Sequence, residues 1–137
     1  MVDKALAKDL RAKIENDSIT VNDIPKYLTV IKEVAKESDE IQDEIDGWVK
    51  TIQFIVTDKL DAWISFDNGE VEVVIGKKEN ADVTLQMDEA TAVGLFAGRV
   101  DGASAYMAGN LKVVGPLPDA IKFNNVSQII RDELQDV

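Results

Sequence analysis

The spacing of apolar residues changes at Lys50, and this change limits the fold more than any other feature of the chain. Apolar and polar residues alternate from Ile52 to Val56 and again from Leu60 to Phe66. A period of two is typical of strands with one buried face. The dipeptide Asn68-Gly69 readily adopts the positive φ angles of a tight turn, so it predicts a hairpin into a third strand, Glu70 to Ile75. The centre of the chain is therefore expected to form antiparallel strands.

Before Lys50 the spacing is that of helices. Apolar residues recur at intervals of four and predict a short helix from Asp3 to Glu15, with a stripe made of Val2, Leu6, Leu10 and Ile14. Intervals of three and four then predict one long helix from Ile24 to Trp48, capped by Asn22-Asp23 and ended by Gly47. The stripe of this second helix consists of Ile24, Tyr27, Ile31, Val34, Ser38, Ile41, Ile45 and Trp48.

The long stripe has two interpretations. Its spacing resembles a coiled-coil heptad, which would make the Ile24 to Trp48 helix the contact of a homodimer. Alternatively, the helix lies on the protein's own sheet. We favour the second interpretation because Ser38 interrupts the stripe, and because Leu28 and Val30 widen it beyond a two-position seam.

The second half of the chain alternates strand and helix signals. Asp88 can cap a helix and Gly98 can end it with a positive φ angle. The Asn124-Asn125 pair divides the last helical pattern in two. The expected elements are a strand from Asp82 to Met87, helices from Asp88 to Gly98 and from Gly102 to Ala108, a strand from Leu111 to Val114, and helices from Asp119 to Phe123 and from Val126 to Leu134.

Composition excludes several classes of function. The chain carries 15 Lys and Arg against 26 Asp and Glu, a formal net charge of −11, and the basic residues form no stripe. Nucleic acids and anionic membrane surfaces bind clustered basic residues, so neither is an expected partner. The chain has no His and no Cys, which removes nucleophile-histidine catalysis and the common zinc sites. We therefore expect no enzyme, no metal and no cofactor.

The same features bear on location. The first residues lack the apolar core of a signal peptide, and no run approaches the ~18 apolar residues of a membrane span. The absence of Cys is compatible with a reducing compartment. We expect one cytoplasmic domain over residues 1–137, with a helical part (1–47) and a part made of the sheet and further helices (48–137), and no stable membrane insertion.

Small residues gather after the predicted fourth strand. Between Ala90 and Gly109, 11 of 20 residues are Gly, Ala or Ser. Such residues permit close packing of helices on the sheet, or they leave an apolar space lined by the few large neighbours, Phe96, Tyr106 and Met107. Composition slightly favours close packing, and the two outcomes stay open at this point.

The order of motifs between Ala81 and Phe123 resembles the sterol carrier protein type 2 family. That family has a strand of the form A-D-x-T, then G-[KR]-[LV]-[DN], an aromatic-Met pair followed by Gly, a strand L-K-[VI]-x-G, and a helix with A-x-K-[FL]. The corresponding segments here are Ala81-Asp82-Val83-Thr84, Gly98-Arg99-Val100-Asp101, Tyr106-Met107-Ala108-Gly109, Leu111-Lys112-Val113-Val114-Gly115 and Ala120-Ile121-Lys122-Phe123. Pro116 and Pro118 depart from the family pattern.

The resemblance implies a fold and a function. The fold class is α/β (α+β): a five-stranded, mostly antiparallel sheet with helices covering one face, a hydrophobic tunnel between them, and two N-terminal helices before the sheet. The implied function is that of a non-enzymatic lipid-binding or lipid-transfer domain, whose partner is an acyl chain, a sterol or a similar apolar molecule. The expected lining is Phe96, Tyr106, Met107, Leu111, Val113, Leu117, Ile121 and Phe123. The alternative is an interaction or dimerisation module with a vestigial cavity, accessory to a partner enzyme.

Overall fold

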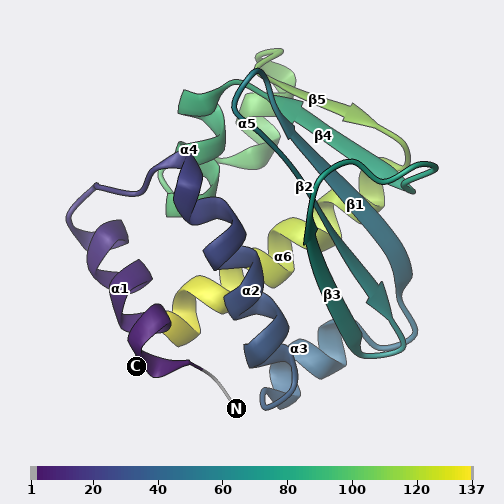
Figure 1. Cartoon of the computed structure of the whole chain (residues 1–137). Coiled ribbons are helices and arrows are strands. Elements are labelled where there is room, and N and C mark those ends of the chain that lie inside the picture. The colour runs from purple at the N-terminus through teal and green to yellow at the C-terminus, as the bar shows by residue number, and fades with distance from the viewer. Residues whose placement is uncertain (1–2, 137) are drawn as a thin grey trace.

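The computed structural model describes residues 3–136. Three helices and one short 3-10 turn come before the first strand of a five-stranded sheet, and three further helices follow later in the chain (Figure 1). The first helix, α1 (Lys4–Glu15), begins at Asp3, whose side chain accepts a hydrogen bond from the Leu6 amide at 3.1 Å. Ala7 and Leu10 are its buried residues. Val2, which we placed on the same stripe, lies outside the described residues.

A buried carboxylate connects α1 to the next helix. Asp23 ends the turn η1 (Val21–Asp23) and is almost fully buried. Its oxygens accept hydrogen bonds from Lys13 Nζ at 2.8 Å and from the Thr20 amide at 2.9 Å. Burial alone would raise the pKa of Asp23, but these hydrogen bonds outweigh it and hold the pKa below its usual value. The charged form of Asp23 is therefore part of the folded state.

The prediction of one helix from Ile24 to Trp48 is wrong. The segment forms two helices, α2 (Ile24–Ala35) and α3 (Asp39–Glu44). The break occurs because Ser38 caps the second helix, accepting from the Ile41 amide at 3.3 Å, and its hydroxyl also donates to Glu133 at 2.7 Å. A serine hydroxyl can hydrogen-bond to nearby backbone amides, which favours a helix start over a helix interior. The hydrogen bond to Glu133 of the C-terminal helix further favours a helix start at Ser38.

The apolar stripe of this segment is used inside the chain. Apart from Ser38, every stripe residue is buried: Ile24, Tyr27, Ile31, Val34, Ile41, Ile45 and Trp48. These side chains pack into the protein's own core, so they offer no seam to a second subunit. The packing follows the interpretation that we favoured from the sequence.

The sheet has the order β3-β2-β1-β4-β5. Its strands are β1 (Val49–Val56), β2 (Leu60–Asp67), β3 (Glu70–Ile75), β4 (Val83–Met87) and β5 (Leu111–Val114). The pairings β1–β2, β2–β3 and β4–β5 are antiparallel, and β1–β4 is parallel. The predicted hairpin turn is present, with φ angles of 51° at Asn68 and 90° at Gly69. The expectation of a five-stranded, mostly antiparallel sheet is thus confirmed.

Three helices complete the fold: α4 (Glu89–Ala97), α5 (Gly102–Met107) and α6 (Leu117–Leu134). As expected, Asp88 caps α4 by accepting from the Thr91 amide at 2.8 Å. The predicted break at Asn124-Asn125 is wrong, because α6 is continuous. Asn costs a helix only about 0.7 kcal/mol, whereas burying Phe123 and Val126 on either side contributes about 1.5–3 kcal/mol each.

The helices cover one face of the sheet, as expected from the sequence. Figure 1 shows α2, α4 and α6 on the same side of the strands. Phe54 points from β1 into this layer, with its ring centroid 5.6 Å from that of Phe96 and 5.1 Å from that of Phe123. On the opposite face, the side-chain amide of Gln53 on β1 donates a hydrogen bond to the Gly76 carbonyl, just after β3, at 3.1 Å. The core therefore lies between the sheet and the helices.

Candidate ligand-binding cavity

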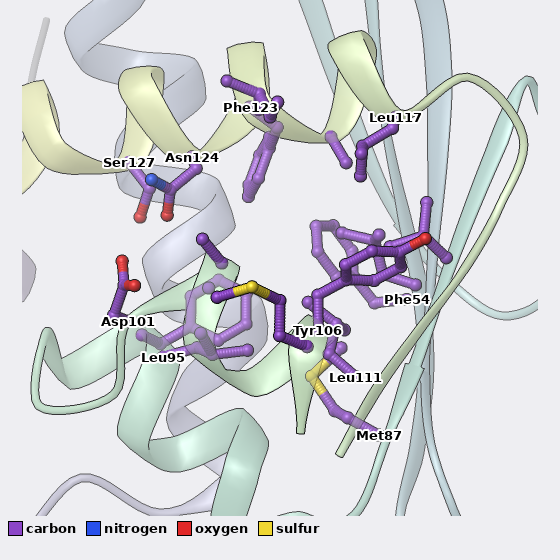
Figure 2. Close-up of a pocket in the computed structure, with 18 residues that line it drawn as sticks. Phe54, Met87, Leu95, Asp101, Tyr106, Leu111, Leu117, Phe123, Asn124 and Ser127 are labelled. Atoms are coloured by element: carbon purple, nitrogen blue, oxygen red, sulfur yellow. The ribbon is translucent and has the colours of Figure 1, made fainter. Parts of the chain in front are cut away.

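A largely apolar cavity of about 520 Å³ lies between the β4–β5 side of the sheet and the helices α4, α5 and α6. Its size falls within the range of about 300–1,000 Å³ that small-molecule sites occupy. Figure 2 shows 18 lining residues. They are Phe54, Leu85, Met87, Leu95, Phe96, Asp101, Gly102, Ala103, Tyr106, Met107, Leu111, Val113, Leu117, Ala120, Ile121, Phe123, Asn124 and Ser127.

The small residues permit close packing at some positions and border a space at others, but the close contacts are with Val100 and α6 and not with the sheet. Gly94 and Gly98 allow close packing: a Cβ atom at Gly94 would collide with Val100 Cγ2, and one at Gly98 would lie 2.8 Å from Arg131 Nε. At Gly102, by contrast, the nearest atom to an added Cβ is Asn124 Oδ1 at 3.5 Å. Gly102 and its neighbour Ala103 line the cavity. The small residues at the start of α5 thus border the cavity, whereas Gly94 and Gly98 permit close contacts outside its lining.

All eight residues predicted from the sequence lie in this lining. They occupy two environments. Phe96, Leu111 and Phe123 are buried and form the inner wall. Tyr106, Met107, Leu117 and Ile121 are exposed, Met107 by 79% and Ile121 by 54%, and form an apolar rim; Val113 is intermediate. That these residues bind a ligand stays a prediction.

Several lining residues were missed by the sequence analysis. Phe54, Leu85 and Met87 lie on the inward faces of β1 and β4, and the alternation of these strands could have indicated them. Ala120 and Leu95 carry no such signal. The polar residues Asp101, Asn124 and Ser127 were also missed, because nothing local distinguishes them from other capping or helical residues; they lie together at one end of the cavity (Figure 2).

The polar end is held by two sets of hydrogen bonds. Asp101 caps α5, and its carboxylate accepts from Ser104 Oγ at 2.9 Å and from the Ser104 amide at 3.1 Å. These bonds lower the pKa of Asp101, so its carboxylate is charged at neutral pH. Ser127 is buried on α6; the Tyr27 hydroxyl donates to its carbonyl at 2.9 Å, and Arg131 Nη1 donates to its Oγ at 3.1 Å.

Tyr27 on α2 contacts two residues of the cavity lining, Ser127 at the polar end and Phe96 of the inner wall. Burial raises the pKa of Tyr27, and its ring packs edge-on against Phe96, with centroids 5.2 Å apart. The hydroxyl therefore stays protonated and serves as a hydrogen-bond donor between α2 and α6. This contact fixes Ser127 and, with it, the end wall of the cavity.

The other end of the cavity depends on the start of α6. Trp48 Nε1 donates to Asp119 Oδ1 at 3.0 Å, and Lys50 Nζ lies 3.3 Å from Asp119 Oδ2. These two contacts hold the start of α6, whose first two turns carry Leu117 and Ile121, against the beginning of β1. The rim is thus positioned by residues far away in the sequence.

The described residues also bear on the requirements of a metal site and of a membrane span. Within residues 3–136, no three His, Cys, Asp or Glu side chains gather so as to hold a metal ion. None of the helices in this range combines the length and apolar character needed to cross a bilayer. The arrangement is suited to enclosing apolar groups, with hydrogen-bonding groups at one end.

Comparisons with known proteins agree with this geometry. The model of the SCP-2 sterol transfer family matches residues 28–128, well over half of the chain. Sterol carrier protein 2 of Gallus gallus is 26% identical over 106 residues, which cover 71% of this chain and 19% of that protein. The chain therefore spans about a fifth of the length of this relative.

Solved structures that share the fold include a small domain and an enzyme. The palmitated SCP2L2 of Aedes aegypti has a TM-score of 0.59 and 17% identity, covering 80% of this chain and 95% of that one. The sec-alkylsulfatase Pisa1 of Pseudomonas has a TM-score of 0.53 and 24% identity, covering 64% of this chain and 14% of that one. The fold thus occurs both as nearly a whole protein and as a small part of an enzyme. On the extent of the family match, this chain belongs to the SCP-2 sterol transfer family.

Proposed function

We propose that this protein is a non-enzymatic lipid-binding or lipid-transfer domain, which holds an acyl chain, a sterol or a similar apolar ligand in the cavity between the sheet and α4, α5 and α6. The observation that carries the proposal is the chemistry of the lining: aliphatic, aromatic and Met side chains surround most of the space, and polar groups lie at one end. Family membership and the palmitated relative from Aedes aegypti support it.

Apolar burial supplies enough free energy for such a ligand. Each buried methylene contributes about 0.8 kcal/mol, so a chain of twelve carbons gains roughly 9 kcal/mol before the cost of immobilisation. This attraction does not depend on charge, so it is compatible with the net charge of −11. It also requires no precisely matched polar partner, and specificity among skeletons is expected to be low.

The exposed rim provides a route into the cavity. Tyr106 and Met107 on α5 face solvent next to Leu117 and Ile121 on α6, and all four also line the cavity. An apolar ligand can pass over these side chains without crossing a charged barrier. We propose Phe96, Leu111, Val113 and Phe123 as the inner contacts of the bound ligand and these four as the contacts nearest the opening.

The remaining parts of the proposal concern the context of the protein. We propose that residues 1–137 act as one domain in the cytoplasm, without a cofactor and without catalysis. The alternative, a dimerisation module that uses the Ile24 to Trp48 segment, is disfavoured because the stripe of that segment is buried in the chain itself. An accessory role beside an enzyme has some support from the fold shared with the sulfatase.

Native mass spectrometry of the purified protein tests the proposal, together with displacement of a fluorescent apolar probe. We expect co-purified lipid adducts, or displacement of the probe by long-chain ligands after the protein has been delipidated. A folded protein that carries no lipid and gives no displacement would refute the proposed function. Identification of the extracted lipid would name the natural ligand.

A further inference from the structure

The polar groups at the end of the cavity have an uneven charge. Asp101 contributes a carboxylate, Asn124 a carboxamide and Ser127 a hydroxyl, and among the described residues that line the cavity none is Lys or Arg. Figure 2 shows these three side chains grouped together, away from Phe54 and Leu117 at the apolar end. The head group of a ligand that fills the apolar part would therefore meet a negative charge and neutral hydrogen-bonding groups.

The cation that contacts the polar end, Arg131, does not itself line the cavity. Arg131 lies behind Ser127, outside the lining. Its guanidinium donates to the Ser127 hydroxyl at 3.1 Å, to the Leu95 carbonyl at 3.4 Å and to the Gln128 side chain at 2.9 Å. All three acceptors are uncharged parts of the protein that hold the guanidinium in place. A ligand carboxylate would thus be brought toward Asp101 without a positive partner.

We infer that the cavity prefers amphiphiles with an uncharged hydroxyl head group over those with a free carboxylate, and that Asp101 sets this preference. The inference rests on the proposed function. A hydroxyl can donate to the Asp101 carboxylate or to Asn124 Oδ1, and it can accept from the Asn124 amide. A carboxylate can only accept, and it is repelled by Asp101. A fatty alcohol and a sterol share the required hydroxyl.

Displacement of the uncharged probe N-phenyl-1-naphthylamine by dodecanol and by dodecanoate at about pH 8 tests this. The two ligands have the same alkyl chain, but the carboxylate also binds less well because it must lose its own hydration. The variant Asp101→Asn is therefore the decisive measurement, since it removes the charge of Asp101 and leaves the hydration of the ligand unchanged. Asn is as good a helix cap as Asp, so α5 should persist. Asp101 is exposed. Repulsion between its carboxylate and a second negative charge about 4 Å away therefore weakens binding about fivefold in a water-like medium, and added salt reduces this factor.

We therefore expect Asp101→Asn to tighten dodecanoate about fivefold at low ionic strength and to change dodecanol by less than about twofold. Asp88→Asn is the matched control: Asp88 caps α4 in the same way but lies outside the lining, so neither affinity should change. Asn124→Asp should act in the opposite direction and weaken dodecanoate further. Cholesterol delivered from cyclodextrin provides a second hydroxyl ligand, and its affinity should likewise change by less than about twofold in Asp101→Asn.

Three results would overturn the inference. One is an unchanged ratio of the dodecanol and dodecanoate affinities in Asp101→Asn. Another is equal tightening of both ligands. The third is a preference for dodecanoate that is lost in Arg131→Gln, which would make Arg131 the head-group anchor. In all three cases binding itself remains, so the proposed function stands. If the folded protein binds neither the probe nor any ligand, the proposed function fails and the inference fails with it.

Discussion

Filling the cavity from α6 should weaken ligand binding without weakening the fold. Ala120 lines the cavity and packs against the core, and Ala120→Leu adds three carbon atoms on that side. If they occupy space that ligand methylenes would use, binding loses about 0.8 kcal/mol per group, or roughly 2.4 kcal/mol in total. This corresponds to a dissociation constant about 50-fold larger.

The stability of the unliganded protein should move in the other direction. Filling a void restores contacts that the lining side chains lack, so the free energy of unfolding is expected to rise by up to about 2 kcal/mol. Opposite changes in binding and stability are the signature of an occupied cavity. A substitution that merely disturbs the fold lowers both.

The assay combines displacement of N-phenyl-1-naphthylamine by dodecanol with urea unfolding of the delipidated protein. Ala90→Leu is the control, because Ala90 is exposed on α4 and lies outside the lining. A folded Ala120→Leu variant that binds dodecanol within about threefold of the original protein would refute the reasoning. If Ala120→Leu does not fold, Ala103→Leu from α5 places the same three carbons in the cavity and is held to the same criterion.

Three further predictions concern the fold. Ser38→Ala removes the cap of α3 and the hydrogen bond to Glu133, so the free energy of unfolding in urea should fall by about 1–2 kcal/mol; an unchanged midpoint would contradict the capping role. Gly94→Ala gains about 1 kcal/mol of helix propensity but forces a methyl group onto Val100, which costs about 1–3 kcal/mol, so a lower melting temperature is expected, and a higher one would show that Val100 yields. The pKa of Asp23 is lowered by folding, so its stabilisation is fully present above the unfolded value of about 3.9 and is lost as the pH falls toward the folded value. Thermal unfolding between about pH 6 and pH 3 should therefore decline less steeply in Asp23→Asn, and parallel curves would rule out this contribution.

Local patterns were sufficient for much of the architecture. Alternation identified β1 and β2, Asn68-Gly69 identified the hairpin between β2 and β3, and Asp88 identified the beginning of α4. Each of these signals depends on a residue and its near neighbours, since a strand face, a turn and a cap are set by the backbone angles and hydrogen bonds of a short segment. The order of motifs after Ala81 also indicated residues that the structure places in the lining, such as Phe96 and Phe123.

The errors arose where a distant segment changed a local preference. Ser38 could have continued a helix, but Glu133 from α6 contacts its hydroxyl and a new helix begins there. Asn124 and Asn125 could have ended a helix, but the core on either side of them keeps α6 continuous. In both cases a weak propensity of less than about 1 kcal/mol was overruled by contacts across the fold.

The sequence by itself determined the strands, the hairpin, the cap of α4 at Asp88 and the excess of small residues that makes a cavity feasible. The predicted cap at Asn22-Asp23 is wrong, because the side chain of Asp23 makes no capping hydrogen bond to α2. Only the tertiary structure decided that Gly94 and Gly98 close the packing while Gly102 and Ala103 leave space, and that Asp101, Asn124 and Ser127 meet at one end of it. The physical reason is that a strand or a cap depends on neighbours along the chain. A cavity depends on how closely α4, α5, α6 and the sheet approach one another, and that distance is set by side chains from every one of them.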